Sequence, residues 1–151
     1  MTLEAILAYL HLLAILTMVV FISSEAALCR VQWLNAAVVE RLAKVDRVYG
    51  IAAIAVLVTG VARTWWGVKG TAWYWSNPLL HVKLTLFIVI GVISIFPTLT
   101  YFRWRKALRS NGTLPGEVEI SKTRRLVMVQ AHLLAVIPLV AVFLARGFGS
   151  K

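Results

Sequence analysis

Four apolar stretches, each long enough to cross a lipid bilayer as a helix, constrain this sequence more than any other feature. They cover approximately residues 3–28, 48–66, 78–102 and 126–145. Crossing the hydrocarbon core takes about 20 apolar residues in a helix, and a helix satisfies its own backbone groups in lipid. The sequence therefore predicts an all-α integral membrane protein, a four-transmembrane-helix bundle. The length allows a single transmembrane domain, residues 1–151.

Composition and charge exclude several classes of protein. Hydrophobic residues make up 60% of the chain, whereas soluble domains hold about 45–50%. The net charge of +10 lies in short connections between apolar stretches, so we expect a lipid bilayer as partner and no nucleic acid. Cys29 is the one cysteine, which rules out an internal disulfide and a thiolate metal cluster.

The basic residues predict an orientation. The connections after the first and third stretches hold eleven of the sixteen Lys and Arg residues. Because cytoplasmic loops are enriched in Lys and Arg, we expect both connections in the cytoplasm and both termini outside. In the first connection, apolar residues from Val31 to Val45 recur at helical spacing. This pattern indicates either an amphipathic helix on the inner surface or an extension of the second span.

Ionisable residues inside a membrane are costly and mark candidate sites. His11, Met18 and Glu25 follow one another at seven-residue intervals, so they lie close to one helical face. We expect this face to point into the bundle. His11 is then either a haem or metal ligand through a neutral imidazole nitrogen, or a histidine hydrogen-bonded to another helix.

Lys83 and His81 lie two residues apart, which is about 200° around a helix. They therefore cannot share a face. Ser94 and Tyr101 share the side of Lys83, and this polar side favours Lys83 as the residue that points inward. The alternative for Lys83 is that its side chain reaches the outer interface.

Three further groups complete the candidates. His132 lies near the middle of the fourth stretch and is a candidate second ligand. Arg63, at the outer end of the second stretch, either anchors the helix at the interface or forms an electropositive pocket for carboxylates with His11, Lys83 and Lys69. Glu25 and Asp46 face the basic connections, so we expect salt bridges with the arginines there (Arg103, Arg105, Arg124 or Arg125), with a proton relay as the alternative.

Several short segments carry a resemblance to known proteins over essentially the whole chain. The sequence is similar to a family of small bacterial membrane proteins of unknown function, and this implies a location in the bacterial inner membrane. The segments that match are Ala8-Tyr9-Leu10-His11, Ser24-Glu25-Ala26-Ala27-Leu28, Asp46-Arg47-Val48-Tyr49-Gly50, Thr59-Gly60, Lys69-Gly70, Leu80 to Leu84, and Arg103-Trp104-Arg105.

More distantly, the chain resembles HemJ, the family of membrane protoporphyrinogen oxidases, and the copper-resistance membrane proteins CopD. The resemblance to HemJ implies a short helical bundle that binds haem b. It also implies a histidine in the first span, where His11 lies, and a lysine in the third, where Lys83 lies. The sequence departs from HemJ near the fourth span, where Gln130-Ala131-His132 replaces an acidic residue and a proline.

Three functions follow from these observations. The first is a haem b membrane redox protein, with His11 as the iron ligand and Lys83, Arg63 and His132 as further cofactor-binding residues. The second is a transporter or permease subunit for a metal or small anion, which predicts broken helices. The third is a non-catalytic membrane scaffold. A homo-oligomer and an unidentified redox partner are compatible with all that the sequence shows.

Reporter fusions test the predicted orientation. A reporter fused at Gly112, in the third connection, should report the cytoplasm, and one fused at Lys151 should report the outside, because basic connections are retained on the cytoplasmic side. The opposite pair of results, Gly112 outside and Lys151 inside, would show that this orientation is wrong.

Overall fold

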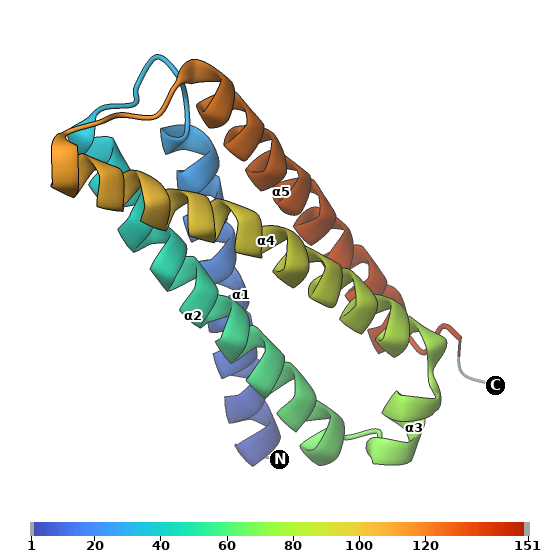
Figure 1. Cartoon of the computed structure of the whole chain (residues 1–151). Coiled ribbons are helices and arrows are strands. Elements are labelled where there is room, and N and C mark those ends of the chain that lie inside the picture. Colours follow the sequence, from blue (N-terminus) through green and yellow to red (C-terminus); the bar gives the residue numbers. More distant parts are fainter. Residues whose placement is uncertain (1, 150–151) are drawn as a thin grey trace.

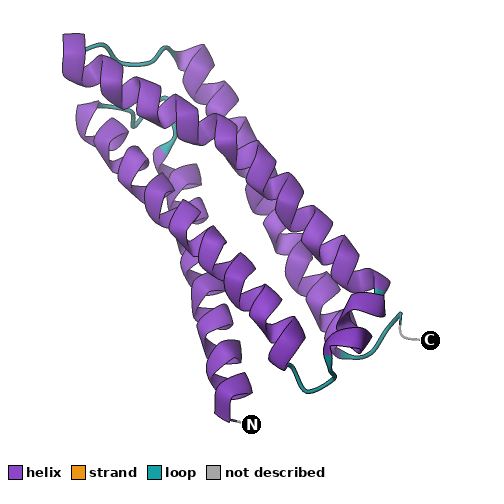
Figure 2. Cartoon of the chain, turned by 60° about the horizontal axis from the view of Figure 1, so that its bottom comes forward, coloured by secondary structure: helices purple, strands orange, loops and turns teal. Residues whose placement is uncertain are grey.

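The computed structural model describes residues 2–149, and these residues form five helices joined by short connections. The helices are α1 (Thr2–Leu28), α2 (Ala36–Trp66), α3 (Thr71–Ser76), α4 (Pro78–Asn111) and α5 (Glu117–Ala145) (Figures 1 and 2). All except α3 are long and apolar enough to cross a membrane. The prediction of an all-α, four-transmembrane-helix bundle is confirmed, and each predicted stretch lies within one long helix.

The long helices form two antiparallel pairs. Helix α1 packs along α2, and α4 packs along α5, while α2 touches α4 and α1 touches α5 less extensively. The pairs diverge toward the end that carries α3 and both ends of the described chain, here named the terminal end (Figure 1). The opposite end carries the connections 29–35 and 112–116 and is named the basic end.

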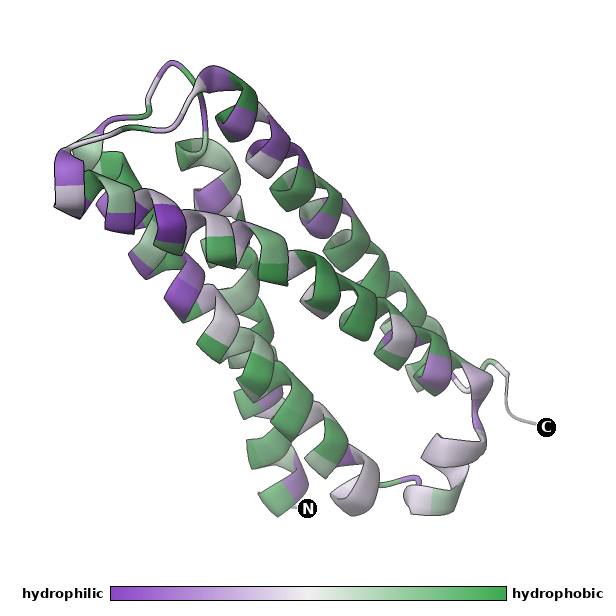
Figure 3. Cartoon of the chain, viewed as in Figure 1, coloured by the Kyte–Doolittle hydropathy of each residue, from purple (hydrophilic) through white to green (hydrophobic). Residues whose placement is uncertain are grey.

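Three helices continue past the predicted spans at the basic end. Helix α2 begins at Ala36 after the N-cap Asn35, whose side chain accepts a hydrogen bond from the Val38 amide. The first connection is thus partly an extension of the second span, one of its two interpretations. Helix α4 runs to Asn111 and ends at Gly112, whose positive φ of 70° suits glycine. Hydropathy finds the lipid-crossing part of a helix, and the polar turns beyond it escape that signal (Figure 3).

The surface of the bundle is apolar along the middle of each long helix. Ile54, Ile88 and Leu99 each expose more than half of their surface. In water such a surface would mark an interaction site, whereas lipid tails cover it at no cost. Figure 3 shows this apolar band, with hydrophilic residues gathered toward the basic end.

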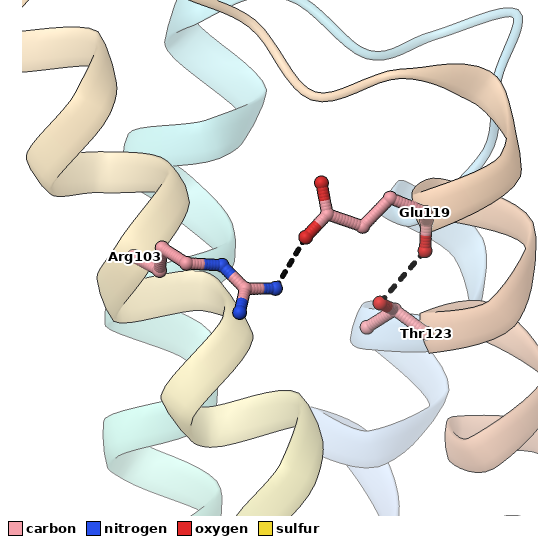
Figure 4. A network of polar contacts seen from close by, with 3 residues as sticks. All are labelled: Arg103, Glu119 and Thr123. Carbon is pink, nitrogen blue, oxygen red and sulfur yellow. Dashed lines mark hydrogen bonds and ion pairs between the residues drawn. The ribbon is translucent and has the colours of Figure 1, made fainter.

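Ion pairs connect helices at the basic end. Arg109 donates two hydrogen bonds to Glu40, at 2.6 and 2.9 Å, and so joins α4 to α2. Arg103 pairs with Glu119 and joins α4 to α5 (Figure 4). The Thr123 hydroxyl donates to the Glu119 carbonyl one turn earlier, at 2.9 Å. Each of these exposed pairs contributes little stability. The sequence pattern indicates no partner for Glu40, Arg109 or Glu119, and the structure pairs all three.

Cys29 should be almost unreactive in the folded protein. It is fully buried just after α1, and burial raises the pKa of its thiol to about 11. Because the thiolate is the nucleophile, maleimide should label native Cys29 on the order of 100-fold more slowly than an exposed cysteine at pH 8. Mass spectrometry of the detergent-solubilised protein measures this rate. Ser110→Cys in a Cys29→Ser background is the exposed control, and equal rates for the two would contradict the burial.

Candidate functional site: a pocket between the helix pairs

A cavity of about 410 Å³ lies between the two helix pairs, in the half of the bundle nearer the terminal end. All four long helices line it. Most of its wall is apolar, and Ile15, Val56, Phe87 and Leu134 contribute to it. The divergence of the pairs explains its position, because side chains that fill the narrow half of the bundle no longer meet in the wide half.

His11 is the histidine that reaches this pocket. Its side chain is buried, with 4% exposed, and its Nδ1 lies 2.8 Å from the Thr59 hydroxyl on α2. That hydroxyl donates its own proton to the Ala55 carbonyl at 2.6 Å, so it accepts from His11 Nδ1–H. The Val56 carbonyl also lies beside the ring. This arrangement assigns the Nδ1–H tautomer and leaves the lone pair on Nε2.

Gly60 lets α1 and α2 approach at this point. A Cβ added to Gly60 would lie 3.1 Å from His11 Cε1, which is tighter than ordinary van der Waals contact. The ring therefore packs against bare backbone, and any larger residue at position 60 would push it. The pair Thr59-Gly60 thus fixes both the hydrogen bond and the position of the imidazole.

Lys83 and Arg63 also line the pocket. Lys83 is half-buried, while His81 is exposed and bonds to the Trp75 carbonyl at 2.9 Å. The prediction that Lys83 rather than His81 points into the bundle is confirmed. Arg63 lies 3.9 Å from Glu4. In the described part of the chain Lys83 makes no ion pair.

Two candidates lie elsewhere. His132 is exposed on α5, does not line the pocket, and its Nδ1 lies 2.6 Å from the Met128 carbonyl of its own helix. The α5 register turns it toward lipid, and this position does not support a role as second ligand. Lys69 is exposed as well, and its amine donates to the Ala145 carbonyl at the end of α5. The predicted electropositive pocket therefore holds Lys83 and Arg63 without Lys69.

Trp75 is a pocket residue that the sequence did not single out. It lies in α3, lines the cavity, and its indole donates to the Thr64 hydroxyl at 3.2 Å. Trp75 directly follows Trp73 and Tyr74, aromatic residues of the kind that commonly lie at a membrane–water interface, and nothing in the sequence pattern separates Trp75 from these neighbours. Only the packing of α3 beneath the helix pairs distinguishes it.

The inward face of α1 is as predicted, but the ion pairs expected for Glu25 and Asp46 are not formed among the described residues. The buried residues of α1 are His11, Met18, Ile22 and Glu25. The expected salt bridges of Glu25 and Asp46 with nearby arginines are wrong for the described residues. Arg103 pairs with Glu119, and Arg124 donates to the Ala26 carbonyl. Both carboxyl groups are buried toward the basic end, away from the pocket.

The described residues do not form a metal site from His, Cys, Asp and Glu side chains alone. Within residues 2–149 no group of three or more His, Cys, Asp or Glu side chains could hold a metal ion. His11 by itself could bind a metal only as one ligand to a metal whose other positions are already filled. A porphyrin, with four nitrogens of its own, satisfies that condition.

The fold and pocket define a small helical integral membrane protein with a mostly apolar internal pocket. The chain belongs to the family described as predicted membrane protein (DUF2214), whose profile matches residues 3–149. The expected family of small membrane proteins of unknown function is thereby confirmed. No curated protein and no solved structure matches the chain.

Thr59→Val should destabilise the bundle, because it removes the acceptor of the buried His11 Nδ1–H. Hydrogen bonds between membrane helices are worth about 1 kcal/mol, so reversible unfolding in detergent should show a loss of that size. Thr17→Val is the matched control, since its hydroxyl bonds only to the Leu13 carbonyl of its own helix. Equal losses in the two variants would show that the His11–Thr59 bond contributes nothing.

Proposed function

We propose that this protein is a membrane redox protein that binds haem b in the pocket, with His11 as the axial ligand. One observation carries the proposal: a half-buried lysine lines a mostly apolar pocket and has no anionic partner among the described residues. An unpaired ammonium group in such surroundings is costly. A ligand that brings its own carboxylates would remove that cost.

The state of His11 supports the same ligand. Histidines that bind metals commonly donate their other ring N–H to a hydrogen-bond acceptor, which fixes the ring and its tautomer. The Thr59 hydroxyl is such an acceptor at 2.8 Å. The remaining lone pair on Nε2 is the donor that a haem iron requires.

The polar and apolar parts of the pocket fit the two parts of a haem. Its macrocycle is apolar, and the walls between the helix pairs are apolar too. Its propionates are anionic, and the Lys83 amine and the Arg63 guanidinium would bind them through charge-assisted hydrogen bonds. A bound haem would supply one-electron chemistry, while His11 holds it and the lipid-covered bundle excludes water.

A transporter or permease subunit is less well supported. Transporter sites are commonly built at broken helices near the middle of the membrane. Helices α4 and α5 continue without a break past Pro97 and Pro138, and α1 and α2 are continuous as well. A non-catalytic scaffold would leave Lys83 unpaired in the pocket. That alternative therefore does not explain why a half-buried lysine lines the pocket.

The orientation and location are part of the proposal. The basic end gathers the connections rich in Lys and Arg, so we place it in the cytoplasm and the pocket nearer the outer surface. Both termini would then lie outside, and the membrane would be the bacterial inner membrane that the family resemblance implies. The pocket would then lie on the side remote from the cytoplasm.

His11→Ala should abolish haem binding. The variant and the wild type are purified after expression with abundant haem, and absorption spectra are recorded. The wild type should show a Soret band, and His11→Ala should lose it, because His11 is the histidine among the described residues that line the pocket. His132→Ala is the control and should keep the wild-type spectrum, since that ring lies outside the pocket.

Two results would overturn this assignment. A wild-type protein without a Soret band would contradict haem binding and leave the scaffold or the transporter. A full wild-type spectrum in His11→Ala would show that another residue is the ligand.

A further inference from the structure

The six acidic residues of this chain differ in their burial and in whether they form ion pairs. There are six acids against sixteen basic residues. Three acids form ion pairs with arginines: Glu4 with Arg63, Glu40 with Arg109, and Glu119 with Arg103. Glu117 is exposed at the start of α5. Glu25 and Asp46 alone are buried, with 2% and 4% of their surface exposed, and within residues 2–149 neither forms an ion pair.

The two buried carboxyl groups differ in their hydrogen bonds. Asp46 Oδ1 accepts a hydrogen bond from the Thr98 hydroxyl at 2.8 Å. Glu25 Oε1 has no hydrogen-bond partner in the described part of the chain. The groups act on each other electrostatically across the α1–α2 contact. Although the chain has sixteen Lys and Arg residues, none in the described part forms an ion pair with either buried acid.

Two further polar atoms in the same place lack partners. The Tyr101 hydroxyl on α4 is buried, with 1% of the residue exposed. It lies beside the Glu25 carboxyl group and the Cys29 thiol, but within residues 2–149 it makes no hydrogen bond of ordinary geometry with either. The indole nitrogen of Trp104 is equally without a partner, and its ring packs edge-on against Tyr101 at 5.6 Å. Buried polar atoms are rarely left in this state.

Among the described residues, the other groups around Glu25 form no ion pair with it. Tyr49 on α2 donates its hydroxyl to the Gln130 side chain on α5 at 3.2 Å. Cys29, after α1, carries a neutral thiol. Arg124 on α5 acts electrostatically on the neighbouring Cys29, and its Nε donates to the Ala26 carbonyl at 3.4 Å rather than to a carboxylate.

Two carboxylates buried together without a cation cannot both stay ionised, because each pays the cost of desolvation and each repels the other. A proton bound to one of them removes one charge and supplies a donor. We propose that Glu25 and Asp46, with Tyr101, form a proton-binding site that exchanges its proton with water at the basic end of the bundle.

The hydrogen bonds assign the proton to Glu25. Thr98 donates to Asp46 and stabilises it as the anion, whereas no hydrogen bond of ordinary geometry reaches Glu25 Oε1 from the described residues. A protonated Glu25 can donate to the Tyr101 oxygen, so two unpartnered atoms would satisfy each other. Glu25 lies in the last turn of α1, one turn from the connection at the basic end, so a proton taken from water has a short path. The site takes up one proton and releases one, and no other reactant is involved.

Infrared spectroscopy tests this proposal. The full chain is reconstituted in vesicles of neutral phospholipid in potassium buffer, and spectra are recorded from about pH 5 to about pH 10. The wild type should show the carbonyl band of a protonated carboxylic acid at neutral pH and lose it at high pH. Glu25→Gln should lack the band, and Glu40→Gln, the control at an arginine-paired acid, should keep it.

Isotope labelling covers the case in which Glu25→Gln does not fold. In wild-type protein, ¹³C-glutamate should shift the band and ¹³C-aspartate should not. A band that is absent, or that does not change with pH, would overturn the proposal, as would one that survives in both Glu25→Gln and Asp46→Asn. A band removed only by Asp46→Asn would overturn the assignment to Glu25. Loss of the band on adding sodium at constant pH would identify a cation site instead.

Discussion

Hydrocarbon provides no hydrogen-bond partner and no counter-ion, and the arrangement of this bundle follows from that constraint. Each polar side chain must reach an end of a helix, bond to the backbone of its own helix as His132 does, or find polar partners inside the bundle. The arginines at the basic end take the first course, and Arg103 and Arg109 join helices there. The groups that cannot reach an end gather in two places, around His11 and around Glu25. Between them, Met18, Ala52 and Ile90 belong to the buried apolar core.

Both places lie on the inward face of α1. His11 and Glu25 are fourteen residues apart, which is about 21 Å along a helix. They therefore face different partners: Thr59 and the pocket at one level, Asp46 and Tyr101 at the other. The helix pairs diverge at the first place (Figure 1), where the cavity lies, whereas the side chains of Glu25, Asp46 and Tyr101 at the second place are buried. One suits a molecule of some size, and the other suits a proton.

The sequence predicted the positions that follow from periodicity. Seven-residue spacing placed His11 and Glu25 inward, and the angle between His81 and Lys83 placed the lysine inward. It did not predict which groups pair, because pairing depends on the relative depth and rotation of helices far apart in the chain. Arg103, one of the expected partners of Glu25, pairs with Glu119 instead, and the register of α5 turns His132 outward. Thr59 had no periodic signal as the partner of His11, although the segment Thr59-Gly60 was among those that carried the family resemblance.

The central claim is that His11 presents a neutral nitrogen to a haem, held by the Thr59 hydroxyl. Solid-state NMR of the protein in bilayers tests this claim most directly. The three histidines are labelled with ¹⁵N, and spectra are recorded before and after haemin is added. We expect the Nδ1–H tautomer for His11 in the absence of haemin. On addition, its Nε2 signal should disappear beside the paramagnetic iron, while His81 and His132 remain unchanged. An unchanged His11 signal, or equal changes in all three rings, would contradict the account.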